Sequence, residues 1–189
     1  DKTLEKASRA GLKMVMWGLE SGSRRIMESI NKGIDLDKRF DILKIANKYG
    51  IWNFAFIFFG YPLEAPDDAR ETIKMLADNH EFINSYGRSI FTMGRHAKIA
   101  EEPEKFGITK ILEKEEEFSP SIDFECVGMT KDELNNIIEE CKQSSLIHYK
   151  NPLWMYLRYR EWLFLYIKHF GLSWVQNYEI DMNKLTNIV

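Results

Sequence analysis

A carboxylate and several small hydroxyl side chains follow directly after an apolar stretch near the start of the chain. Val15-Met16-Trp17 leads into Gly18-Leu19-Glu20-Ser21-Gly22-Ser23, and a helical pattern begins near Ser23. A parallel strand delivers polar side chains to the ligand-binding end of an α/β sheet or barrel in this way. A carboxylate such as Glu20 accepts hydrogen bonds from both hydroxyls of a vicinal diol. The alternative is that Glu20 only caps the helix that begins near Ser23, and Ser23 itself suits a helix N-cap.

Two more features follow in an order that matters for chemistry. Lys32, within Asn31-Lys32-Gly33, lies twelve residues after Glu20. There it can bind a carboxylate, or it can complement the dipole of the preceding helix without binding any ligand. A second apolar stretch, Trp52 to Phe59, breaks at Gly60-Tyr61-Pro62-Leu63-Glu64. Glycine in that break allows the backbone to approach a flat ring closely.

The order, spacing and residue types of these motifs resemble the C-terminal half of the radical S-adenosylmethionine domain, over roughly residues 3–95. In that family a strand ends in Gly-Val-Glu-Ser-Gly, an Asn-Lys/Arg-Gly follows the next helix, and a later strand ends in Gly-Phe-Pro-Gly-Glu. The resemblance implies a parent oxidoreductase or transferase that cleaves S-adenosylmethionine at a [4Fe–4S] cluster to a 5′-deoxyadenosyl radical. The cofactor carries that chemistry, and the protein supplies position and exclusion of water.

The resemblance also implies binding roles for the residues at the first strand end, and no catalytic role for any residue of this chain. Glu20 is expected to accept hydrogen bonds from the ribose hydroxyls of S-adenosylmethionine, with Ser21 and Ser23 as weaker contacts. Lys32 is expected to pair with the methionyl carboxylate, where its point charge is less directional than the fork of an arginine. The fragment by itself is expected to be inactive.

The later motifs match the family less closely. Gly60 and Pro62 lie where the family contacts adenine, but Leu63 replaces the second glycine of the family motif, so the turn is expected to differ. Some relatives carry an acidic ribose contact within the strand that corresponds to residues 52–59, and the equivalent position in this chain is Phe56. Gly94, at the end of a third strand pattern, is expected to lie beside adenine.

The cysteines do not fit the expected cluster. Cys126 and Cys141 lie fifteen residues apart, whereas the family holds its cluster with three cysteines in a CxxxCxxC run. The chain begins at Asp1, inside what reads as the end of a helix, so we expect a fragment whose partner is the missing N-terminal portion that binds the cluster. Glu-Ser-Gly-Ser with Ile-Asn-Lys-Gly most resembles the subgroup with an N-terminal cobalamin-binding domain, which includes anaerobic Mg-protoporphyrin monomethyl ester cyclase-like proteins. Cobalamin is then a further cofactor expected of the parent.

Composition and charge favour an ordinary globular protein. The 189 residues have a formal net charge of −3, with 44% hydrophobic and 29% charged residues. No basic stripe favours nucleic acid as a partner, and no apolar run approaches the ~18 residues of a membrane span. Two cysteines do not make a disulfide framework, so a reducing cytoplasm is the expected compartment. The expected ligand beside the cofactor is an unidentified small-molecule substrate.

Residues 1–95 alternate between strand and helix patterns, which is typical of a parallel sheet. Strands are expected at 13–19, 52–59 and 88–93, and helices at 3–10, from Ser23, from Asp35 to Gly50 and from Pro66 to Asn79. The predicted class is α/β, a partial TIM-like barrel of about three parallel strands with outer helices. Residues 96–129 are expected to form an irregular linker with short helices. Residues 130–189 are expected to form a helical C-terminal extension, with helices beginning at Thr130 and Pro152.

Two other functions stay open on these observations. The half-barrel could be a scaffold for the helical extension, which would make the chain a non-catalytic interaction module. A different TIM-like enzyme could instead bind phosphate at helix N-termini. That function needs a glycine-rich loop, and Gly18, Gly22 and Gly33 are spread too thinly to form one.

Overall fold

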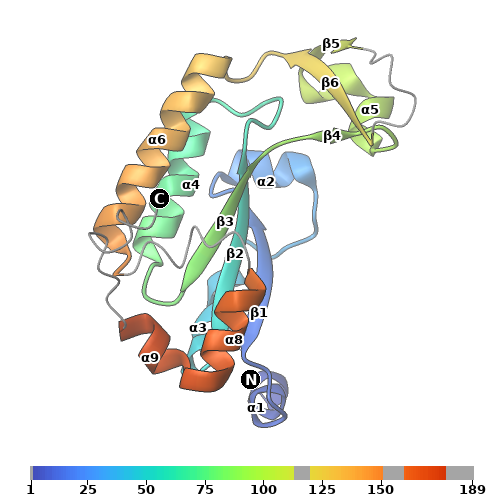
Figure 1. The fold of residues 1–189 in the computed structure, drawn as a ribbon. Helices are drawn as coiled ribbons and strands as arrows, with labels where there is room; N and C mark the ends of the chain where they lie inside the picture. The colour runs from blue at the N-terminus through green and yellow to red at the C-terminus, as the bar shows by residue number, and fades with distance from the viewer. Residues whose placement is uncertain (1, 113–119, 151–159, 178–189) are drawn as a thin grey trace.

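A sheet of three parallel strands, in the order β1-β2-β3, forms the centre of the computed structural model (Figure 1). The structure describes residues 2–112, 120–150 and 160–177. The strands are β1 (Met14–Glu20), β2 (Trp52–Phe59) and β3 (Ser85–Ile90). Helices flank the sheet and follow it at the C-terminal end. This arrangement confirms the predicted α/β class and is compatible with a partial α/β barrel.

The first two strands follow their sequence patterns closely, and the third does not. β3 begins at Ser85, whereas the apolar pattern predicted a strand near 88–93. Ser85 and Tyr86 are buried and pair with Phe54 and Ala55 of β2, so this strand enters the sheet through residues that do not stand out as apolar. Met93, at the end of the predicted segment, belongs to a different sheet.

The helices of the first half connect and cover the strands. They are α1 (Lys2–Arg9), α2 (Arg24–Ile30), α3 (Arg39–Lys48) and α4 (Pro66–Asp78). α3 begins at Arg39 and not at the predicted Asp35, because the Asp35 carboxylate accepts hydrogen bonds from the backbone N–H groups of Asp37 and Lys38 and closes a separate turn. Gly50, the predicted end of this helix, follows α3 with a φ of 69°, which is the conformation of a glycine at a helix C-terminus.

One face of the sheet is buried beneath helices. Leu19 of β1 and Ala55, Ile57 and Phe59 of β2 form its apolar surface, and residues of α3, α4 and α6 (Lys131–His148) pack against it. α4 and α6 lie side by side on this face (Figure 1). The predicted capping box begins α6, with the side chain of Thr130 accepting from the Glu133 N–H. No helix within the described ranges, α6 included, is long and apolar enough to cross a membrane.

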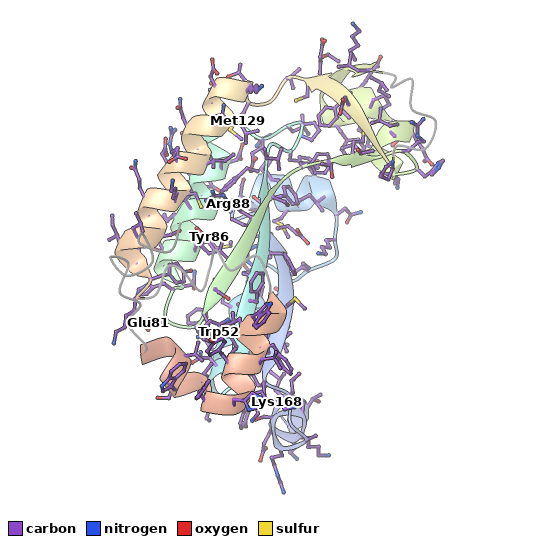
Figure 2. The ribbon with its side chains drawn as sticks, in the orientation of Figure 1. Trp52, Glu81, Tyr86, Arg88, Met129 and Lys168 are labelled. Carbon is purple, nitrogen blue, oxygen red and sulfur yellow. The ribbon has the colours of Figure 1, made fainter. Side chains whose placement is uncertain are left out.

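The residues that the structure describes cover the opposite face of the sheet only partly. At the amino ends of the strands, Trp52 and Phe54 pack against α8 (Arg160–Phe170) and α9 (Leu172–Asn177), and Trp52 lies where α8 meets the sheet (Figure 2). Towards the carboxyl ends, Phe56 and Phe58 on the same face are only half-buried. The predicted start of a helix at Pro152 lies outside the described residues.

The described residues between β3 and α6, 91–112 and 120–130, form a small lobe, which we call the β4–β6 lobe (Figure 1). Its elements are β4 (Met93–Gly94), α5 (Lys98–Glu101), the 3₁₀ helix η1 (Pro103–Phe106), β5 (Ile108–Leu112) and β6 (Ser121–Cys126). The strands pair antiparallel in the order β4-β6-β5. The short helices were expected in this segment, but the strands were not. β4 has only two residues, and β5 and β6 are short and mix charged with apolar residues, which leaves too little pattern to detect.

Candidate functional site

Glu20 and Lys32 form an ion pair at the carboxyl end of β1. The Lys32 ammonium contacts the Glu20 carboxylate, and the two side chains are 43% and 18% exposed. Glu20 is the last residue of β1 and has a φ of 60°, a left-handed conformation that non-glycine residues adopt rarely. The register with β2 also shifts between Gly18 and Glu20, and a shift of this kind changes the direction in which the Glu20 side chain points. Backbone strain of this kind is concentrated at functional sites.

Gly18 provides the space in which this ion pair lies. A Cβ atom at position 18 would overlap the Lys32 ammonium and the Glu20 carboxylate, so the pair lies directly over the Gly18 backbone. Gly18 pairs with Phe56 of β2, which places the ion pair on the incompletely covered face of the sheet. In the sequence, Gly18 was recognised only as part of a motif. Its position two residues before Glu20 is the sequence feature that could have indicated that it provides space for the Glu20 side chain.

The turn after β2 lies at the same edge of the sheet. Gly60 has a φ of 82°, which glycine adopts without strain, and its N–H donates to the Glu64 carboxylate across 2.6 Å. The Glu64 N–H in turn donates to the Tyr61 carbonyl across 2.7 Å, and Pro62 is buried between them. Leu63 at the position of the second family glycine therefore does not prevent a tight turn.

Glu64 is the residue of this turn that the sequence pattern did not single out. Its side chain is fully buried, and among the described residues its Oε1 atom has no hydrogen-bond partner. Burial raises the pKa of Glu64 to about 7, because a carboxylate loses its hydration there. The sequence feature that could have identified Glu64 is its place four residues after Gly60, which matches the glutamate of the family motif. No role was assigned to that glutamate.

Ser21 and Ser23 lie inside the protein and bind other side chains. The Ser21 hydroxyl shares a hydrogen bond of 3.1 Å with the Thr72 hydroxyl of α4. The Ser23 hydroxyl donates to Asp68 of α4 across 2.7 Å, and Ser23 occupies the N-cap position of α2 without capping it through its side chain. Both serines are at most 2% exposed. This placement favours support of the β1–α2 turn, and their direct contact with a cofactor stays a prediction.

Asp68 and Arg25 connect this support to the Gly60 turn. The Arg25 guanidinium pairs with Asp68 and donates to the Leu63 carbonyl across 2.8 Å. Asp68 also accepts from the Ala65 N–H across 2.9 Å at the start of α4. The β1–α2 turn, the Gly60 turn and α4 are thus joined by one polar network behind the Glu20–Lys32 pair.

A cavity of about 750 Å³ lies next to these residues, between the end of α2 and the β4–β6 lobe. We call it the α2–α5 cavity. Gly94 of β4 lies in its wall, together with the rings of Phe58, Tyr61 and Phe91. A Cβ at Gly94 would make only an ordinary contact with Ala97, so the backbone faces open space there. Gly94 therefore borders a ligand-sized volume, although its contact with adenine stays a prediction.

The described residues hold no group of three or more histidine, cysteine or acidic side chains arranged to bind a metal ion. Cys126 lies half-buried in β6, and Cys141 is buried in α6. Burial raises the pKa of the Cys141 thiol, which disfavours the thiolate that iron–sulfur ligation requires. The thiols of this chain therefore do not fit a [4Fe–4S] cluster.

Comparison with known proteins gives one partial similarity that bears on function. No family model matches the chain. The chain is 34% identical, over 74 residues, to the uncharacterized methyltransferase PH0819 of Pyrococcus horikoshii. The matched segment is 39% of this chain, and the chain spans only 16% of the length of that relative. The radical, iron–sulfur and cobalamin expectations stay predictions, and the comparisons establish a limited similarity to a protein described as a methyltransferase.

Proposed function

We propose that this chain binds S-adenosylmethionine at the carboxyl ends of β1 and β2. The observation that carries the proposal is the Glu20–Lys32 ion pair, on the face of the sheet that the described residues cover only partly. Glu20 accepts hydrogen bonds from the two ribose hydroxyls, and Lys32 pairs with the methionyl carboxylate. By the family resemblance the adenine ring lies near the Gly60 turn, and the Leu134 and Ile90 side chains pack over Gly60 itself. The partial similarity to a methyltransferase supports this ligand class.

Exchange of the ion pair for the ligand is energetically reasonable. Lys32 is 43% exposed, and pairs of this exposure contribute about 0–1 kcal/mol. A ligand that presents a diol to Glu20 and a carboxylate to Lys32 replaces one salt bridge with several charged hydrogen bonds. Each of those is worth about 1.5–3 kcal/mol. The backbone of the β1–α2 turn does not have to move, because the polar network behind it is already satisfied.

The finer proposal is that the whole protein is a radical S-adenosylmethionine enzyme of the cobalamin-binding subgroup. S-adenosylmethionine would supply the reactive group, and the residues of this chain would orient it and exclude water. The cluster would need ligands other than Cys126 and Cys141, so no step of the reaction is assigned to residues of this chain.

Equilibrium dialysis of the 189-residue chain with S-adenosylmethionine tests the proposal. Glu20→Ala and Lys32→Ala should each weaken binding roughly tenfold to a hundredfold, the equivalent of about 1.5–3 kcal/mol. Glu71→Ala and Lys48→Ala, which alter exposed residues on α4 and α3, are the matched controls and should leave the affinity unchanged.

Thermal unfolding of the same variants separates binding from a structural role. A residue that only caps a helix costs about 1 kcal/mol of stability on replacement and leaves the dissociation constant unchanged. A lowered melting temperature with unchanged affinity would therefore remove Glu20 from the binding site. Absence of S-adenosylmethionine binding by the unmodified chain would refute the proposed function.

A further inference from the structure

The α2–α5 cavity has the size and position of a site for a second small molecule. Its volume of about 750 Å³ lies within the range of about 300–1,000 Å³ that is typical of ligand pockets. Asn31 of its wall directly precedes Lys32 in the chain, and Phe58 of its wall directly follows Ile57, the β2 residue that pairs with Glu20. A molecule in the cavity would lie beside the proposed cofactor site.

The inner wall of the cavity is aromatic. The rings of Phe58, Tyr61 and Phe91 contact one another, with centroid separations of 6.2, 5.7 and 5.1 Å. Tyr61 is only 4% exposed, and the buried side chains of Met93 and Ile99 pack in the same cluster. Such a wall is fixed in place by its own packing, and it favours an apolar ring that can stack on or against it.

The outer rim of the cavity carries two ammonium groups. Lys98 of α5 and Lys105 of η1 both line it and are exposed, and Glu28 of α2 is the acidic residue among the lining side chains. Lys105 contacts Glu102 across 3.1 Å, an exposed pair between residues three apart in the chain. Such a pair is weak and easily exchanged for a ligand anion. The two lysines exceed Glu28 by one positive charge among the lining side chains, and a ligand anion would take the place of Glu102 at Lys105.

We propose that the α2–α5 cavity binds the substrate, and that this substrate is an apolar ring compound bearing a carboxylate or phosphate group. The ring lies against the Phe58, Tyr61 and Phe91 wall, and the anionic group lies at Lys98 and Lys105. The designation as substrate rests on the proposed function, because that function places the cofactor at the adjacent Glu20–Lys32 pair. The ligand class rests on the cavity alone.

Fluorescence titration of the 189-residue chain with 8-anilinonaphthalene-1-sulfonate, an anionic ring compound, tests the ligand class. N-phenyl-1-naphthylamine, which has the same rings without the anion, is the matched neutral probe. The double variant Lys98→Ala, Lys105→Ala should weaken sulfonate binding about fivefold to tenfold, as expected for loss of two exposed charge contacts. The neutral probe should bind this variant as before. Lys110→Ala with Lys131→Ala, two exposed lysines outside the cavity lining, is the control.

Filling the cavity checks that the probes bind there and not on other exposed aromatic residues. Thr92 lines the cavity and is exposed, so Thr92→Trp adds bulk without replacing a core residue. This variant should weaken the binding of both probes. The probes are excited at wavelengths outside the tryptophan absorption band. Unchanged sulfonate binding in the lysine variant, or in Thr92→Trp, would overturn the proposal.

S-adenosylmethionine affinities of the same variants distinguish the two proposals. The lysine variant should keep its affinity for S-adenosylmethionine, and Glu20→Ala should keep its affinity for the sulfonate probe. Competitive displacement of the sulfonate probe by S-adenosylmethionine would overturn the substrate assignment, because the cavity would then belong to the cofactor. If the chain failed to bind S-adenosylmethionine but the probe results held, the proposed function would fail while the ligand class of the cavity stood.

Discussion

Replacement of Glu64 by glutamine should change how the stability of the protein depends on pH. Glu64 is fully buried, and its Oε2 atom accepts the Gly60 N–H. Burial raises its pKa from 4.5 to about 7. In the unfolded chain the carboxyl group loses its proton near the lower value, whereas the folded protein keeps the proton until the higher value. Folding therefore becomes less favourable as the pH rises between these two values.

The size of the effect follows from the same shift. A rise in pKa from 4.5 to about 7 corresponds to about 3 kcal/mol, at roughly 1.4 kcal/mol per pH unit. The unmodified chain should lose this amount of unfolding free energy between about pH 4.5 and pH 7, from this residue alone. Glu64→Gln keeps an acceptor for the Gly60 N–H and does not titrate. Its stability relative to the unmodified chain should therefore rise over this pH range and stay constant above it.

Urea unfolding of both proteins from about pH 4.5 to pH 8.5 is the assay, and the difference between the two curves isolates Glu64 from all other titrating groups. Glu71→Gln, an exposed residue on α4, is the matched control, and its curve should run parallel to that of the unmodified chain. If the Glu64→Gln curve also runs parallel, the carboxyl group is not buried in the way described. A constant offset between the curves is expected from the amide and does not bear on the result.

Substitutions at three other positions test particular contacts. Gly18→Ala places a Cβ where the Glu20–Lys32 pair lies. Equilibrium dialysis should show S-adenosylmethionine binding weakened by at least as much as in Lys32→Ala. An affinity equal to that of the unmodified chain would contradict the placement of the pair. Thr130→Ala removes the cap of α6 and should lower the unfolding free energy by about 1 kcal/mol in urea titrations, an effect that Thr130→Ser should largely avoid. Leu163→Ala opens a cavity against Trp52 and should cost about 2–5 kcal/mol, and a loss below about 1 kcal/mol would mean that α8 does not pack on the sheet.

The elements that could be predicted from the sequence are those whose buried residues are themselves apolar. β2 is continuously apolar from Phe54 to Phe59, because one face lies beneath helices and the other is partly covered, and its predicted bounds match those observed. β3 was placed too late, because Ser85 and Tyr86 are buried by their partners in β2 and by α6 rather than by apolar character of their own. Long-range pairing of this kind leaves little trace in a local pattern.

The candidate site was predictable to a similar degree. Glu20 and Lys32 were identified by type and spacing, and the structure brings them together. The burial of Glu64 could not be predicted in this way, because it arises only in the folded turn, where a distant residue, Met129, also donates its N–H to the Glu64 carbonyl across 3.1 Å. In the sequence nothing indicates partners for the hydroxyls of Ser21 and Ser23. In the structure both form hydrogen bonds with side chains of α4, about 45 to 51 residues later in the chain.

The β4–β6 lobe leaves and rejoins the rest of the protein at one place. Phe91 donates its N–H to the carbonyl of Phe59, and Met129 binds Glu64, so both ends of the lobe are tied to the Gly60 turn. Side-chain atoms of Ile90 and Leu134, which flank the two ends, both lie within 3.7 Å of where a Gly60 Cβ would be. A segment whose ends meet behaves as an insertion, and such segments change length and sequence with little effect on the scaffold that carries them. The lobe forms one wall of the α2–α5 cavity, so evolution can change the shape of this wall, and with it the proposed substrate site, while β1, β2 and the Glu20–Lys32 pair stay as they are.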